Sequence, residues 1–101
     1  MASRIELQTK LEELLGSRNV YFQPPSTIKM KYPAIRYELN RIDERHADNT
    51  AYKQDKSYTL TLIDEDPDNE FVSKILKFHG CKFDRFYTSD NLNHYVFTLY
   101  Y

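Results

Sequence analysis

Two segments of the chain alternate apolar and polar residues with a period of two, and this pattern restricts the fold more than any other feature. The apolar positions are Ile35, Tyr37 and Leu39 in residues 33–39, and Tyr58, Leu60 and Leu62 in residues 56–63. Because successive side chains of a strand point to opposite faces of a sheet, the pattern predicts two half-buried strands. The apolar face of such a sheet needs an apolar covering layer.

The N-terminal segment has the features of an amphipathic helix. Ser3 and Glu6 are spaced as a capping box, which predicts a helix start near residue 3. Leucines then recur at helical spacing, and Gly16 provides a left-handed stop. We therefore expect a helix over about residues 4–15.

A second helix is predicted after Asp66-Pro67-Asp68. Asp66 is placed as the N-cap, and Pro67 as the first helical residue. The helix is expected to end at Gly80. Its predicted buried stripe consists of Phe71, Val72, Ile75, Leu76 and Phe78.

Three shorter strands complete the prediction. Residues 20–22 form a brief edge strand because Pro24 and Pro25 follow it. Residues 82–88 and 95–100 form a hairpin around a Ser89-Asp90-Asn91 turn. The order α-β-β-β-α-β-β predicts a single α+β domain over residues 1–101, with an antiparallel or mixed sheet and two helices on one face.

The stretch 40–55 between the two alternating strands is polar and has few apolar residues to bury. We expect it to be an exposed loop or a protruding hairpin.

Charge and cysteine content exclude several classes of protein. Fourteen Lys and Arg stand against fifteen Asp and Glu, a net charge of -1, so the strongly basic field of a nucleic-acid or membrane binder is missing. The single cysteine, Cys81, excludes an internal disulfide and a cysteine-based zinc cluster. With no long apolar run, we expect a soluble protein made inside a cell.

The sequence has no complete catalytic or metal-binding pattern, so we expect no enzyme, no metal and no cofactor. The acidic series Asp64, Asp66, Asp68 and Glu70 resembles the start of a calcium loop, but the sixth position is Asn69 and the twelfth is Ile75. The histidines lie on three different predicted elements. A hydrolase built on Cys81 and His79 is a distant alternative, because residues two apart across a helix stop rarely point together.

Nine tyrosines are the most unusual feature of the composition. Those that face the helices are expected to fill the core. Those on the opposite face of the sheet would leave amphipathic rings exposed, as is typical of protein interfaces.

Several phrases of the sequence resemble small tail-completion proteins of long-tailed bacteriophages of Gram-positive hosts, and the likeness extends over about residues 11–101. The phrases are Asn19-Val20-Tyr21-Phe22-Gln23-Pro24-Pro25, Lys31-Tyr32-Pro33-Ala34-Ile35, Arg45-His46-Ala47-Asp48-Asn49, Tyr58-Thr59-Leu60-Thr61-Leu62-Ile63-Asp64 with Asp66-Pro67-Asp68, and Asp90-Asn91-Leu92-Asn93-His94.

The resemblance implies a tail-terminator protein of the virion, assembled in the host cytoplasm. Such a protein forms a ring, usually of six subunits, that caps the tail tube and meets the head-side connector. DNA only passes through the lumen, and no membrane is involved. A head-completion or neck role at the same joint is the alternative.

A ring subunit needs surface that only its neighbours cover, and the polar stretch and the C-terminal turn are the candidates. The predicted interface residues are Arg41, Asp43, Glu44, Arg45, His46, Asp48, Tyr52, Asp90, Asn91 and His94. A near-zero net charge suits a ring through which DNA slides. The competing hypothesis from another class is a nucleic-acid-binding regulator that stacks bases on aromatic rings beside Lys29, Lys31 and Arg36.

Overall fold

The computed structural model describes residues 4–24, 29–47, 51–68, 70–78 and 80–100, with the backbone alone for 43–47 and 51–55. Within these residues the chain forms a five-stranded mixed sheet in the order β1-β2-β3-β5-β4, together with two helices. The elements are α1 (Arg4–Leu15), β1 (Val20–Phe22), β2 (Ala34–Ala47), β3 (Ala51–Asp64), α2 (Phe71–Leu76), β4 (Cys81–Ser89) and β5 (Leu92–Tyr100). The predicted α+β class and element order are confirmed.

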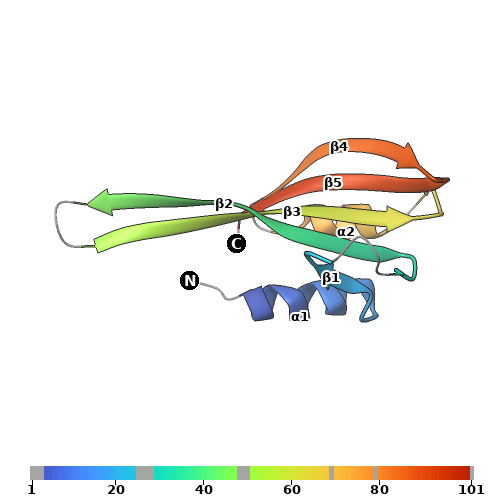
Figure 1. Cartoon of the computed structure of the whole chain (residues 1–101), viewed down its shortest axis with the longest axis horizontal. Coiled ribbons are helices and arrows are strands. Elements are labelled where there is room, and N and C mark those ends of the chain that lie inside the picture. Colours follow the sequence, from blue (N-terminus) through green and yellow to red (C-terminus); the bar gives the residue numbers. More distant parts are fainter. Residues whose placement is uncertain (1–3, 25–28, 48–50, 69, 79, 101) are drawn as a thin grey trace.

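The sheet is mixed because β1 runs parallel to β2, while every other neighbouring pair is antiparallel (Figure 1). The alternating segments predicted from the sequence pair directly, with Ile35 opposite Leu62 and Tyr37 opposite Leu60. Strand β5 pairs with the other side of β3 and places Phe97 opposite Leu60. These residues therefore share one face of the sheet.

Both helices cover that face. The core joins Leu7, Leu11 and Leu15 of α1 and Ile75 of α2 to the buried side chains of the sheet, and Tyr37, Leu60 and Phe97 among these are fully buried. Helix α1 lies along β1 and β2 in Figure 1. Burial of apolar area contributes roughly 25 cal/mol per Å², so this shared layer is the main source of stability.

A part-buried group of hydrogen bonds fixes α1 on the sheet. The Tyr37 hydroxyl donates to Gln8 Oε1 at 2.5 Å and accepts from Arg4 Nη1 at 3.2 Å. Gln8 Nε2 in turn donates to the Val20 carbonyl at 3.0 Å. Helix α1 thus hydrogen-bonds to both β1 and β2. It ends at Gly16, which has a φ of 75° and donates its N–H to the Glu12 carbonyl at 2.9 Å.

The predicted start of the second helix was wrong. Helix α2 begins at Phe71, with Glu70 as its N-cap, and not at Pro67. The side chains of Asp64 and Asp66 accept hydrogen bonds from the backbone N–H groups of Asp66 and Asp68, at 3.3 and 2.9 Å. Short acidic side chains satisfy such turns as readily as they cap helices, and here the turn forms.

Only part of the predicted apolar stripe of α2 is buried. Ile75 is in the core, and Phe71, Val72 and Phe78 are half-buried. Leu76 is exposed, contrary to the prediction, because the six-residue helix covers less of the sheet than the expected longer one.

The polar stretch 40–55 consists largely of continuations of β2 and β3. The backbone pairing of these strands continues out to Ala47 opposite Ala51, past an irregularity between Leu39 and Arg41. In Figure 1 this ribbon extends well beyond the helices and the other strands, and the chain measures 52 × 25 × 23 Å along its principal axes. Of the two predicted alternatives, an exposed loop or a protruding hairpin, the described residues form two paired strands that protrude as a ribbon. Residues 48–50, which join these strands in the sequence, lie outside the described residues.

Candidate protein-interaction surfaces

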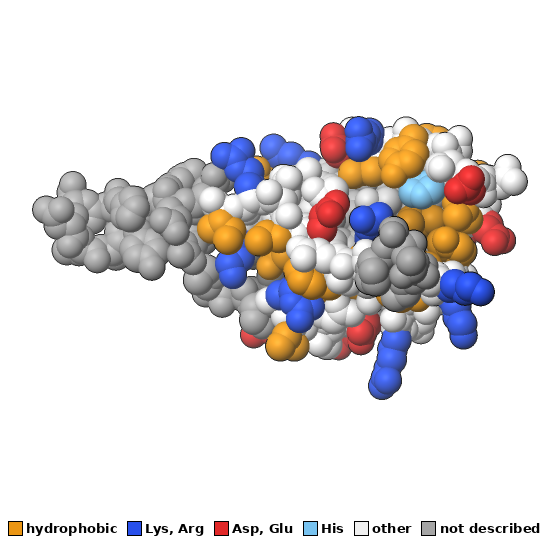
Figure 2. Space-filling view, in the orientation of Figure 1, with side chains coloured by type: hydrophobic (Ala, Val, Ile, Leu, Met, Phe, Trp, Pro, Cys, Tyr) orange, Lys and Arg blue, Asp and Glu red, His pale blue; other side chains and the backbone are white. Residues whose placement is uncertain are grey.

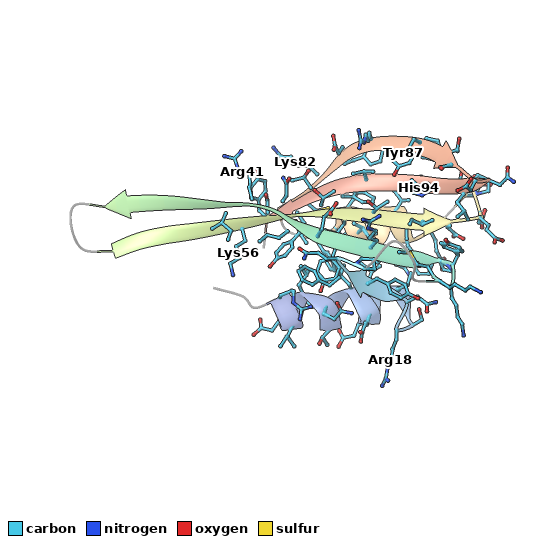
Figure 3. The ribbon with its side chains drawn as sticks, in the orientation of Figure 1. Arg18, Arg41, Lys56, Lys82, Tyr87 and His94 are labelled. Atoms are coloured by element: carbon cyan, nitrogen blue, oxygen red, sulfur yellow. The ribbon has the colours of Figure 1, made fainter. Side chains whose placement is uncertain are left out.

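The face of the sheet opposite the helices, called the open face below, has no covering layer among the described elements. Cross-strand partners there include Arg36 opposite Thr61, Thr61 opposite Val96, and Val96 opposite Arg85. Val96 is buried by its neighbours, but Arg36 and Arg85 are exposed. In Figure 3, Arg41 and Lys82 point away from α1, whereas Arg18 and Lys56 point the other way. Basic side chains are therefore among the exposed groups of the open face.

Strand β4 is exposed along almost its whole length. It forms one edge, and every residue from Lys82 to Ser89 is exposed. The large apolar side chains Phe83, Phe86 and Tyr87 are 48%, 50% and 42% exposed. Figure 2 shows hydrophobic side chains at the surface over β4. An exposed edge strand with aromatic side chains is a feature of association sites.

The C-terminal hairpin places three predicted interface residues together. Asp90 and Asn91 form its two-residue turn with φ values of 53° and 62°, between the paired residues Ser89 and Leu92. Both are exposed, and both have the left-handed backbone that Asp and Asn tolerate in hairpin turns.

His94 follows this turn and packs against an aromatic neighbour. Its ring stacks on that of Tyr87, with centroids 4.6 Å apart and planes 11° apart, and its Nδ1 is 3.2 Å from the Leu92 carbonyl oxygen. The Arg85 guanidinium lies 5.7 Å from the centroid of the Tyr87 ring. Figure 3 shows Tyr87 and His94 side by side on β4 and β5. The stack forms a flat, half-exposed aromatic and cationic surface.

The remaining predicted interface residues belong to the two-stranded ribbon, at the opposite end of the long axis from the Asp90-Asn91 turn (Figure 1). Arg41 is exposed at the base of the ribbon. The backbone of Asp43, Glu44, Arg45 and His46 lies in β2 and that of Tyr52 in β3, and their side chains are outside the description, as is Asp48 entirely. The structure thus separates the predicted residues into two groups and does not bring them into one site.

The tyrosines of the strands lie on both faces of the sheet, some in the core beneath the helices and others exposed on the open face. Tyr37 and Tyr58 are buried against the helices, and Tyr95 is half-buried with its hydroxyl donating to the Pro67 carbonyl at 2.9 Å. Tyr87 and Tyr100 are exposed on the open face. Tyr101 lies outside the described residues.

The metal and thiol chemistry considered in the sequence analysis can be compared with the described residues. No three His, Cys, Asp or Glu side chains among them converge where they could hold a metal ion. Burial raises the pKa of the Cys81 thiol, so the thiol stays protonated at neutral pH, the opposite of what a nucleophile needs. His79 lies outside the description.

Strand β4 is the part of the surface that our sequence reasoning missed. Its residues Phe83 and Phe86 are spaced by three and not by two, which breaks the alternation of a regular strand. The structure accounts for this spacing by a register shift between Phe83 and Arg85, which leaves Asp84 as an extra residue. The spacing of three between Phe83 and Phe86 was the feature of the sequence from which the bulge could have been predicted.

Comparison with known proteins adds no family assignment, because no family model matches the chain and no curated protein is significantly similar to it. Neither α1 nor α2 has the length and hydrophobicity that a membrane-spanning helix requires.

Proposed function

We propose that this chain is a structural protein of a bacteriophage virion that caps the tail tube as a ring and joins it to the head-side connector. The observation that carries the proposal is the form of the surface. A small packed body carries a long two-stranded ribbon at one end and an exposed aromatic edge strand on its side. Both features expose groups that proteins usually cover by association.

The size of the surface is compatible with a ring. A contact of ordinary size buries about 800 Å² on each partner, so the two contacts of a ring subunit would cover roughly 1,600 Å². The chain exposes 6950 Å² in all. The contact in a ring is heterologous, with one patch meeting a different patch on the next subunit. The ribbon of one subunit lying against the body of the next is our proposed arrangement.

The proposed partners are further copies of this chain, the tail tube protein and the connector, with DNA passing through the lumen. The net charge of -1 supports passage without retention, because Lys and Arg contacts to phosphates would hold the DNA. No cofactor takes part.

Removal of the gene from the phage tests the role in the virion. We expect tails of uncontrolled length in electron micrographs, because tube growth would continue without a cap. Tails of normal length would refute the terminator role. Normal tails beside heads that fail to join them would instead support the head-completion alternative.

A shortened ribbon tests the proposed contact. Replacement of residues 43–55 by Asn-Gly connects the paired residues Ile42 and Lys56 with a favoured hairpin turn and leaves the core unchanged. Electron micrographs of preassembled tail tubes should show a ring at the tube end with the native chain and a bare tube end with the shortened chain. A ring formed by a folded, shortened chain would exclude the ribbon as the contact.

A further inference from the structure

Strand β4 leaves one side of its backbone without a neighbouring strand in the described part of the chain. It is the last strand in the order β1-β2-β3-β5-β4, and it is nine residues long. The opposite edge is the three-residue β1. Long edges act as templates for strand addition unless charges, prolines or bulges protect them. Strand β4 has no proline, but it has three charged residues, Lys82, Asp84 and Arg85, and a bulge between Phe83 and Arg85. A strand that pairs with it must therefore match both the charges and the bulge.

The register of β4 assigns its side chains to two faces. Phe83 pairs with Phe97 and Phe86 with Tyr95, on the helix side of the sheet. Lys82 pairs with Thr98 and Tyr87 with His94, on the open face. At the bulge, Asp84 and Arg85 together oppose Val96 of the open face. Without the bulge, Phe86 would point to the open face and Tyr87 to the helix side.

With this assignment the strand is complementary to itself. If two copies run antiparallel about the midpoint between Asp84 and Arg85, each of these residues lies opposite the other. The next pairs outward are Phe83 with Phe86, Lys82 with Tyr87, and Cys81 with Thr88. The members of each pair lie on the same face, so every pair is compatible with a continuous sheet.

Neighbouring registers lack this complementarity. A shift of one residue brings Asp84 opposite Asp84 or Arg85 opposite Arg85, and like charges directly opposite one another are unfavourable. A shift of two residues in one direction brings Lys82 opposite Arg85. In the other direction it brings Asp84 opposite Tyr87 and loses the ion pair. Only the register centred between Asp84 and Arg85 pairs opposite charges and aromatic rings together.

We propose that a second copy of this chain docks on β4 by antiparallel strand addition, about a two-fold axis between Asp84 and Arg85. The two sheets join into one through the edge strands. The symmetry gives each contact twice: two Asp84–Arg85 ion pairs, two Phe83–Phe86 contacts, and two Lys82 ammonium groups beside Tyr87 rings. The pairing covers the exposed aromatic side chains of β4.

This pairing is separate from the ring of the proposed function. A two-fold contact closes after two copies, whereas a ring contact joins unlike patches. The dimer therefore needs neither the ribbon nor the tail tube. The variants of β4 test the dimer, whereas removal of the gene and the shortened ribbon test the ring, so either proposal can be refuted without the other.

A disulfide tests the register. In the proposed pairing, position 88 lies directly opposite the native Cys81 of the other copy, within the Cα separations of about 4.4–6.8 Å that disulfides require. Mild oxidation of Thr88→Cys should give a disulfide-linked dimer near twice 12.1 kDa on a denaturing gel without reductant. Ser89→Cys is the matched control, because the neighbouring position points to the other face. Failure of Thr88→Cys to crosslink, or equal crosslinking of Ser89→Cys, would overturn the proposal.

Charge reversal tests the ion pairs independently of cysteine. Asp84→Arg alone places like charges opposite each other twice and should raise the dimer dissociation constant by at least about tenfold. Arg85→Asp alone should do the same. The double variant Asp84→Arg with Arg85→Asp restores opposite charges and should return the constant to near that of the native chain.

Sedimentation equilibrium measures the dimer dissociation constants of the native chain and of these variants. Glu38→Arg reverses an exposed charge on β2, which β3 and β5 separate from β4, and should leave the dimer unchanged. Equal dissociation constants for the native chain and both single variants would refute the two-fold pairing, as would a double variant weaker than either single one.

Discussion

Replacement of Tyr37 by Phe removes one oxygen atom from the interior and tests how α1 is held on the sheet. The Tyr37 side chain is fully buried, and its hydroxyl joins Gln8 and Arg4. In the variant, Gln8 Oε1 loses its donor and the Arg4 guanidinium loses an acceptor, while the ring still fills its place. The cost is therefore a loss of hydrogen bonding and not a cavity.

The magnitude follows from these two contacts. A neutral hydrogen bond contributes about 0.5–1.5 kcal/mol to stability, and a bond to a charged group contributes somewhat more. Because the Arg4 contact is only part-buried and is 3.2 Å long, we expect a total loss of about 1–2 kcal/mol. For a chain of this size that corresponds to a fall of about 4–16 °C in Tm.

Urea unfolding followed by circular dichroism measures the effect. The midpoint should fall and the slope should stay constant, because the surface exposed on unfolding hardly changes. Tyr100→Phe is the matched control, since that ring is exposed, and it should change the free energy of unfolding by less than about 0.5 kcal/mol. A double-mutant cycle with Gln8→Ala should give a coupling energy of about 1 kcal/mol.

The buried Tyr37 hydroxyl also makes stability depend on pH. Burial raises the pKa of the Tyr37 phenol above its ordinary value of 10.0, and the Arg4 hydrogen bond offsets part of the rise. The unfolded chain then loses its proton first, so this contribution to stability is complete below pH 10 and is lost as the pH rises further. Tyr37→Phe should decline less steeply there. This explanation would be refuted if Tyr37→Phe lowered the free energy of unfolding no more than Tyr100→Phe does, and if stability fell with pH above pH 10 as steeply as in the native chain.

Two further predictions concern Gly80, which directly precedes β4, and Cys81, the first residue of β4. Gly80→Ala should destabilise the chain by more than about 1 kcal/mol, since φ is 80° and an added Cβ would lie 2.8 Å from the Tyr100 carbonyl oxygen. Gly16→Ala, with a similar φ of 75° and no atom within 4 Å, should cost only the backbone strain of about 1 kcal/mol, and equal thermal shifts would contradict the close contact. Burial raises the pKa of Cys81 above its ordinary value of 9.0, so the native chain should lose stability as the pH rises above 9 through ionisation of the unfolded thiol. Cys81→Ala should lose less between pH 8 and 9.5 in urea titrations, and parallel curves would contradict the assignment.

The local patterns of the sequence sufficed for the order of elements and for most of the core. The period of two in residues 33–39 and 56–63 and the leucine spacing of residues 4–15 depend on neighbours along the chain, so they can be recognised without the fold. Leu7, Leu60 and Leu62 are buried as these periods predict. The turn at Asp90-Asn91 follows from local backbone preferences in the same way.

Contacts between distant segments decided where α2 begins. Asp66-Pro67-Asp68 has the composition of a helix cap, yet the Tyr95 hydroxyl binds the Pro67 carbonyl and the Asn93 side chain binds the carbonyls of Asp64 and Glu65. These bonds come from residues almost thirty positions away and hold the segment as a turn. Local preference was indecisive, and the tertiary hydrogen bonds selected one of two conformations.

The predicted interface residues show the same division. Sequence pattern indicates that residues 40–55 and the C-terminal turn are polar and exposed, but it contains no measure of the distance between them, and the structure places them at opposite ends. Only the fold makes β4 an edge strand with exposed Phe83 and Phe86, because exposure depends on which elements lie alongside. The sequence by itself determined which segments form strands and helices, through interactions between near neighbours. The tertiary structure alone decided which aromatic side chains remain for a partner, since that depends on the few elements available to cover a five-stranded sheet.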